Sequence, residues 1–235
     1  MKPIHRMIVL SAVYRQTSAT GPETDVLANN CTVDPTNRFL WRMNSRRMES
    51  EVVRDSVLAV SGKLDRSSGG PEIPETESLS NFRRSLYFRS TPNEKAGFLE
   101  TFDAANPNEC YRRQESVVPQ QALALMNSSL TLDLARQLAE EWSTAAGEGD
   151  SRETRQVFLT TAFENLLTRQ PTTTELESCL TFLDRTMVTI ARSDLKMFPA
   201  GGQTSSRPAA KEAWLRAREN LVHVLFSHND FVTIR

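Results

Sequence analysis

Apolar residues recur every three or four positions over much of this 235-residue chain, which is the spacing of one face of an α-helix. The pattern is clearest after Pro119, which suits the first turn of a helix because its missing N–H needs no partner there. Glycine and proline then separate the periodic segments from one another. The predicted helices cover about residues 119–127, 130–142, 151–168, 172–187 and 209–227. The C-terminal half is therefore expected to fold as a bundle of helices.

One helix start in this half carries a specific local signal. Thr172 is followed three positions later by Glu175, the spacing of a capping box. In that arrangement the threonine hydroxyl accepts from the backbone N–H of the glutamate, and the glutamate side chain accepts from the backbone N–H of the threonine. The sequence thus predicts that a helix begins directly after Thr172.

The N-terminal part is predicted to contain two helices, over residues 3–16 and 37–61, joined by a loop over residues 17–33 that is rich in Thr, Ser, Gly and Asn. Gly62 stands where a left-handed residue commonly ends a helix. Five arginines lie along the second helix at Arg38, Arg42, Arg46, Arg47 and Arg54. Because acidic residues interrupt them, they are interpreted as a solvated or partner-packed face rather than a nucleic-acid site.

The middle of the chain loses the helical pattern. Residues 63–80 contain Gly69, Gly70, Pro71 and Pro74 and are predicted to be irregular. Residues 85–89 form a short β-like run, and residues 98–103 fit a strand or a helix equally well. The expected fold class is mainly α, an irregular multi-helix domain with a small β hairpin or strand element in the middle.

The domain organisation follows from these patterns. We expect residues 1–235 to belong to a single domain with a helical part over 1–66, an irregular part with short strands over 67–118, and a helical bundle over 119–235. No apolar stretch reaches the ~18 residues of a membrane span.

Composition excludes several classes of function. Twenty-eight Lys and Arg face 29 Asp and Glu, and the formal net charge of −1 lacks the basic surplus of a nucleic-acid-binding protein. The three cysteines are far apart and none forms a Cys-x-x-Cys pair, so zinc-ribbon and c-type haem motifs are excluded from this sequence. Three scattered histidines predict no metal site. His223 lies among Leu221, Val222, Val224 and Leu225 and is interpreted as a semi-buried core residue.

The candidate chemistry lies in the middle segment. Arg112 and Arg113 would favour the thiolate form of Cys110, which makes it a candidate nucleophile or redox sulfur, although a packed loop cysteine is the simpler interpretation. Arg83, Arg84 and Arg89 could bind an anion together with Arg112 and Arg113, or form internal ion pairs with Glu100 and Asp103. We predict a binding cluster of Arg84, Asp103, Cys110, Arg113, Gln121 and Asn127, with catalytic residues unknown.

Several motifs together carry a resemblance to a known family. They are His5-Arg6-Met7-Ile8-Val9-Leu10, Asp34-Pro35-Thr36-Asn37-Arg38-Phe39-Leu40-Trp41, Arg54-Asp55-Ser56-Val57-Leu58-Ala59, Gly69-Gly70-Pro71, Phe102-Asp103-Ala104, Cys110 with Arg113, and Pro119-Gln120-Gln121-Ala122-Leu123. From residue 4 to the C-terminus the chain resembles the planctomycete-type PSD domain family of unknown function.

The resemblance implies a setting rather than a mechanism, because no activity is established for the family. Its members usually form the C-terminal domain of large exported proteins, after a c-type cytochrome module and a second domain. It therefore implies a C-terminal portion of a longer protein located in the periplasm or at the cell surface. Its partners would be the N-terminal domains of that protein, and surface or periplasmic proteins. Haem c would occur only in the N-terminal module, with no cofactor in this chain.

Two functions of different classes remain. The first is a non-catalytic helical module that packs against a redox domain or binds a partner or ligand. The second is a fragment of an extracellular enzyme, redox or polysaccharide-related, with a site around Asp103, Cys110 and Arg113. The lack of a recognisable acid, base or nucleophile set favours the first.

Overall fold

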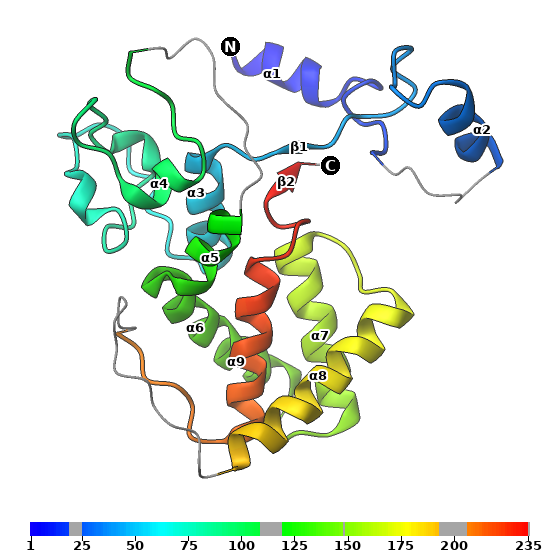
Figure 1. Cartoon of the computed structure of the whole chain (residues 1–235), viewed down its shortest axis with the longest axis vertical. Coiled ribbons are helices and arrows are strands. Elements are labelled where there is room, and N and C mark those ends of the chain that lie inside the picture. Colours follow the sequence, from blue (N-terminus) through cyan, green and yellow to red (C-terminus); the bar gives the residue numbers. More distant parts are fainter. Residues whose placement is uncertain (19–24, 109–118, 148, 193–205, 235) are drawn as a thin grey trace. The chain divides into compact units, whose positions relative to one another are not determined.

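A computed structural model describes residues 1–18, 25–108, 119–147, 149–192 and 206–234. Two compact units can be distinguished along the chain. The N-terminal unit comprises residues 1–48 together with the C-terminal strand that begins at Thr233, and the main unit is Glu49–Val232. Figure 1 shows that the described elements are mostly helices, which confirms the mainly α fold class.

The N-terminal unit contains α1 (Lys2–Val9), α2 (Asp25–Val33), β1 (Arg46–Arg47) and β2 (Thr233–Ile234). The two strands pair antiparallel, with Arg46 opposite Ile234 and Arg47 opposite Thr233. Among the described residues, the paired strands therefore join a segment of the N-terminal unit to the C-terminal segment, and the middle of the chain contributes isolated bridges.

Hydrogen bonds of Asp34 and Asn37 organise the segment after α2, and we call these two residues the polar hub. The carboxylate of Asp34 accepts from the backbone N–H of Arg38 at 3.0 Å and of Phe39 at 2.8 Å. Asn37 adopts a left-handed φ of 56°, and its side-chain amide donates to the Arg42 carbonyl at 2.8 Å. These bonds commit the residues after Asp34 to a turn.

The hub explains why the predicted helix over residues 37–61 is wrong in its first half. A left-handed residue ends an α-helix, and both Asn37 and Leu40 (φ 55°) are left-handed. The helix is α3 (Ser50–Val60), which is preceded by the N-cap residue Glu49. Apolar spacing alone thus overestimated its length.

Two other predictions for the N-terminal unit need correction. The helix predicted over residues 3–16 ends at Val9, because the Ser11 hydroxyl donates to the Ile8 carbonyl at 2.8 Å and the chain continues in turns. The loop predicted over residues 17–33 contains α2 in its second half.

The main unit carries the other helices. They are α3, the 3₁₀ turns η1 (Glu75–Glu77) and η2 (Ser85–Tyr87), α4 (Gly97–Thr101), α5 (Pro119–Asn127), α6 (Ser129–Ala146), α7 (Arg152–Leu167), α8 (Thr173–Ala191) and α9 (Ala213–Phe226). The β-like run over residues 85–89 is a 3₁₀ turn followed by a single bridge between Ile73 and Phe88, and the ambiguous segment over 98–103 is mostly helical.

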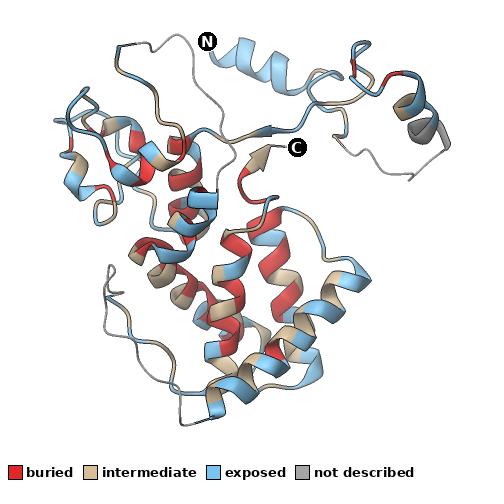
Figure 2. Cartoon of the chain, viewed as in Figure 1, coloured by how far each residue is buried: buried red, intermediate tan, exposed pale blue. Residues whose placement is uncertain are grey.

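Helices α6 to α9 form the bundle expected for the C-terminal half. α9 packs against both α6 and α8, and α6 also packs against α7 (Figure 1). The red segments of Figure 2 show that one side of these helices is buried, and most of the side chains buried there are apolar. Phe158, Leu159, Ala162, Val222 and Phe226 have no exposed surface.

The connection from α7 to α8 confirms the predicted capping box. The Thr172 hydroxyl accepts from the Glu175 N–H at 3.3 Å, and the Glu175 carboxylate accepts from the Thr172 N–H at 2.8 Å. Arg169 donates two hydrogen bonds to the same carboxylate and one to Asp230 at 2.9 Å. The start of α8 is thereby tied to the segment after α9.

No helix in the part of the chain that the structure describes is both long enough and apolar enough to cross a bilayer.

Candidate functional site

A fully buried arginine on α3 holds an irregular surface segment of the main unit in place. Arg54 lies on α3, and its guanidinium donates through Nε to the Ser78 carbonyl at 2.6 Å and through Nη1 to the Arg83 carbonyl at 3.0 Å. Nη2 donates to the Asn81 carbonyl. Since α3 is a regular helix, these bonds fix the irregular segment 78–83 against it.

The burial of Arg54 is an exception to the solvated or partner-packed face predicted for the five arginines, since Arg38 and Arg46 are exposed. Its guanidinium lies 4.7 Å from the centre of the Phe88 ring, a cation–π distance. Burial lowers the pKa of Arg54 to about 10, which still leaves the group charged at neutral pH. The charge is compensated by the carbonyl groups and by Asp55, whose Oδ1 lies 3.5 Å from Nη1.

Asp55 fixes the next turn of the same segment. Its carboxylate accepts from the backbone N–H of Ser85 at 2.8 Å and from the Ser85 hydroxyl at 2.6 Å. Arg84 lies on the opposite side of this carboxylate, with Nε 3.8 Å from Oδ2, and its side chain is 52% exposed. Arg54 and Asp55 thus hold η2 beside α3 and leave Arg84 at the surface.

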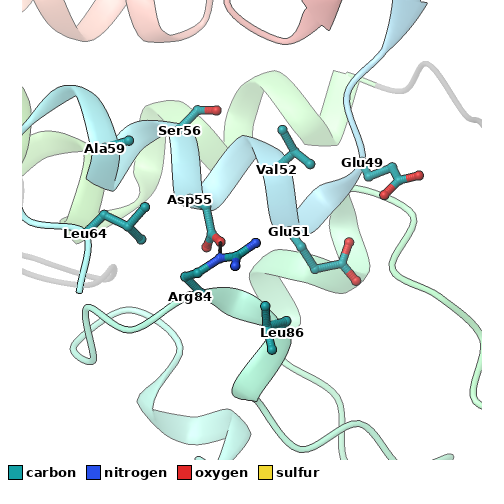
Figure 3. A pocket seen from close by; sticks show the side chains of 9 residues that line it. All are labelled: Glu49, Glu51, Val52, Asp55, Ser56, Ala59, Leu64, Arg84 and Leu86. Atoms are coloured by element: carbon teal, nitrogen blue, oxygen red, sulfur yellow. Dashed lines mark ion pairs between the residues drawn. The ribbon is translucent and has the colours of Figure 1, made fainter. Parts of the chain in front are cut away.

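A groove of about 480 Å³ lies along α3 beside this segment (Figure 3). We call it the α3–η2 groove; it is lined by Glu49, Glu51, Val52, Asp55, Ser56, Ala59, Leu64, Arg84 and Leu86. The lining has three carboxylates and one guanidinium, and the buried Arg54 guanidinium pairs with Asp55 from below, so the net formal charge of the groove is −1. Val52 is 40% exposed and Leu86 is 55% exposed, so the groove also offers apolar surface.

Four of the six residues of the predicted binding cluster are among the described residues. Arg84 lines the α3–η2 groove. Asp103 and Gln121 meet directly, because the Gln121 amide donates to Asp103 Oδ2 at 3.3 Å. Gln121 is fully buried on α5, and Asn127 is the exposed last residue of that helix. Asp103 also has a left-handed φ of 59°.

Cys110 and Arg113 lie outside the described residues. The convergence of all six residues on one site therefore stays a prediction, and so does the nucleophilic or redox role of Cys110.

Two other arginines of the middle segment, Arg83 and Arg89, make internal contacts. Arg89 pairs with Glu72 at 2.7 Å and with Glu94 at 3.4 Å, and this pairing raises its pKa. The Arg83 guanidinium lies 4.0 Å from the centre of the Tyr87 ring. Glu100 is one of the two carboxylates predicted above as arginine partners, and its Oε1 lies 3.2 Å from Lys95 Nζ. Arg89 thus pairs internally, but with partners other than those considered.

Sequence reasoning missed the acidic and apolar lining of the groove. Glu51 and Asp55 are four residues apart, and Val52 lies between them on the same helix. On a helical wheel the three residues share one side wherever the helix begins. The sequence analysis treated the acidic residues only as interruptions of an arginine face, so this shared side was not recognised.

The titratable core residues give no sign of metal binding. Among the described residues, no group of three or more His, Cys, Asp or Glu side chains could hold a metal ion. His223 Nε2 lies 3.2 Å from the Leu125 carbonyl, and burial lowers the pKa of His223. Burial likewise raises the pKa of Cys179 to about 11, which favours the protonated thiol at neutral pH.

The comparison with protein families agrees with the motifs quoted above. Residues 1–183 match PSD1, described as a protein of unknown function (DUF1553). The chain belongs to this family. The match ends inside α8, so it includes all of the N-terminal motifs and the α3–η2 groove but excludes α9. No curated protein and no solved structure matches the chain.

Proposed function

We propose that this chain is a non-catalytic binding module of a larger exported protein, and that the α3–η2 groove is its binding surface. The observation that carries the proposal is the joint presence of three carboxylates and two exposed apolar side chains on a backbone fixed by a buried arginine. A preorganised surface loses little conformational entropy on binding.

Charge and shape select the class of occupant. With a net formal charge of −1, counted over its three carboxylates, Arg84 and the buried Arg54, the groove favours a cationic group over an anionic one. The exposed surface of Val52 and Leu86 favours an apolar side chain next to that cation. A peptide segment in which Lys or Arg alternates with an apolar residue satisfies both requirements.

The family resemblance indicates which proteins would supply such a peptide segment. The resemblance described above puts PSD domains after a cytochrome module and a second domain in an exported protein. The occupant would then be a segment of one of those domains, or of a periplasmic or cell-surface protein that meets them. Any haem c would belong to the cytochrome module, since the present sequence has no Cys-x-x-Cys-His attachment motif.

The proposal can be tested with a synthetic probe. A fluorescein-labelled peptide of alternating lysine and leucine is titrated with the 235-residue protein, and fluorescence anisotropy gives Kd. A peptide in which glutamate replaces each lysine serves as the charge-reversed probe. We expect micromolar binding of the basic peptide, weakening with added salt, and no binding of the acidic one.

Variants assign the binding to the groove. Glu49→Gln with Glu51→Gln should weaken binding about fivefold, because an ionic attraction at a partly exposed surface is lost. The matched control is Glu164→Gln with Glu177→Gln, two exposed glutamates on α7 and α8, which should leave Kd unchanged. Equal affinity in both double variants would overturn the proposal.

A further inference from the structure

A second cavity of the main unit shares no residue with the α3–η2 groove. It is formed by the end of α6, by Gly147 and Gly149, and by the start of α9. We call it the α6–α9 pocket; its volume is about 330 Å³ and it is lined by Glu140, Ser143, Thr144, Gly147, Gly149, Trp214 and Leu215. This volume lies at the small end of the range of ligand sites, and a cavity half as large already holds a benzene ring.

Trp214, the aromatic residue of the pocket lining, packs against a buried arginine. Arg218 is fully buried one turn further along α9, with its guanidinium 4.8 Å from the Trp214 ring centre and 4.9 Å from that of Phe158. The same guanidinium donates to Asp150 Oδ1 at 3.1 Å. Trp214 is therefore backed by a cation that is itself anchored, which fixes the indole ring as a surface for stacking.

A buried hydroxyl in the same lining lacks a partner. Ser143 is 4% exposed, and within the described part of the chain its Oγ has no hydrogen-bond partner. Polar atoms this deeply buried are nearly always bonded, so an exception calls for an explanation. A ligand that carries one hydrogen-bonding group would supply the missing bond.

The one charged residue of the described lining is paired within the protein, because Glu140 on the rim forms an ion pair with Arg207. Arg218 does not belong to the lining; it shares the Asp150 carboxylate with a second arginine, and its Nε and Nη1 have no hydrogen-bond partner among the described residues. The described lining therefore offers an aromatic wall, an apolar side chain at Leu215 and a neutral hydroxyl, with a single charge that is paired. These are the features of a site for an uncharged ring rather than for an ion.

We propose that the α6–α9 pocket binds a small uncharged aromatic molecule that carries one hydroxyl or carbonyl group. The ring lies against Trp214 and Leu215, and its polar group bonds to the Ser143 hydroxyl. This site uses none of the residues of the α3–η2 groove, so it stands or falls independently of the proposed function.

The probes are p-cresol, which has the hydroxyl, and toluene, which has the same ring and methyl group without it. Saturation-transfer NMR and the quenching of tryptophan fluorescence measure their binding to the 235-residue protein. We expect p-cresol to bind with a millimolar Kd and at least about threefold more tightly than toluene, the discrimination of one modest hydrogen bond.

Two variants separate the ring from the hydrogen bond. Thr144→Phe places a ring in the pocket and should abolish binding of both probes. Thr181→Phe on α8 is the matched control, because both threonines are exposed and both hydroxyls donate to the carbonyl four residues earlier at 2.9 Å. Ser143→Ala should keep toluene binding and remove the preference for p-cresol.

Two results would overturn this inference. One is the absence of binding by either probe to the folded wild-type protein, with folding checked by circular dichroism. The other is binding that Thr144→Phe leaves intact, which would place the probes elsewhere.

Discussion

The N-terminal unit and the main unit are stabilised by different kinds of interaction. The main unit encloses large apolar side chains such as Phe158 and Phe226, which have no exposed surface. In the described residues of the N-terminal unit, the buried side chains are those of Asp34 and Asn37, both polar. Its apolar side chains remain in contact with solvent: Phe39 is 77% exposed and Met7 is 68% exposed.

This difference teaches where the stability of the chain resides. Burying one phenylalanine side chain contributes about 1.5–3 kcal/mol, whereas one intramolecular hydrogen bond contributes about 0.5–1.5 kcal/mol net. A unit organised by the hydrogen bonds of Asp34 and Asn37 is therefore expected to open at much lower cost than the main unit. The main unit should dominate the cooperative unfolding transition.

The largest expected effect concerns the core of the main unit. Phe158→Ala should lower the free energy of unfolding by about 3–5 kcal/mol, because it leaves a cavity and removes the ring against the Arg218 guanidinium. Phe39→Ala is the matched control in the N-terminal unit and should change it by less than about 0.5 kcal/mol. Urea unfolding followed by circular dichroism measures both. A comparable loss in the two variants would show that Phe39 is buried in solution.

An intermediate effect is expected from acid. The hydrogen bonds from Arg169 lower the pKa of Glu175 to about 2, against 4.5 for an ordinary glutamate. Because the unfolded chain binds this proton more readily, the stabilisation is fully present above pH 4.5 and is lost as the pH falls toward 2.

Glu175→Gln tests this origin of the acid sensitivity. At pH 7 this substitution should lower the free energy of unfolding by about 1–2 kcal/mol. This is less than the full pKa shift would give, because the carboxylate is partly exposed. It should also flatten the decline of stability between pH 4.5 and pH 2. Urea midpoints measured across this range give the result, and an unchanged slope would contradict the assignment to Glu175.

The smallest effect is a local one in the N-terminal unit. Asp34→Ala removes the acceptor of the Arg38 and Phe39 N–H groups. Amide hydrogen exchange at these two positions should accelerate roughly tenfold, the change expected for one lost hydrogen bond, while the main unfolding transition stays in place. A shift of that transition would mean that the two units unfold together.

Some features of this protein follow from short stretches of sequence. The helices of the C-terminal bundle were predicted to within about four residues at each end, because apolar spacing and glycine or proline breaks act locally. For α9, the predicted start at residue 209 precedes the observed start at Ala213. The capping box at Thr172 and Glu175 was predicted for the same reason, since both partners are three residues apart. The family motifs are likewise read directly from adjacent residues.

Other features depend on side-chain contacts that apolar spacing does not reveal, or on contacts between distant residues. Asp34 ends the predicted helix over 37–61 in its first half by accepting from N–H groups four and five residues along, which a helix would use. β1 and β2 pair residues 46–47 with 233–234. Of the predicted cluster, the tertiary structure places Arg84 at the α3–η2 groove and Asp103 beside Gln121, and the sequence did not single out Asp55 and Glu51.

Arg54 shows the physical reason for this division. In sequence it is one of five arginines with acidic neighbours, and solvent exposure is the ordinary expectation for such a residue. It is buried because the carbonyl groups of Ser78, Asn81 and Arg83, 24 to 29 residues away, take the place of water around its guanidinium. Local periodicity is determined by the sequence by itself, whereas the replacement of water by distant partners is decided only when the tertiary structure forms.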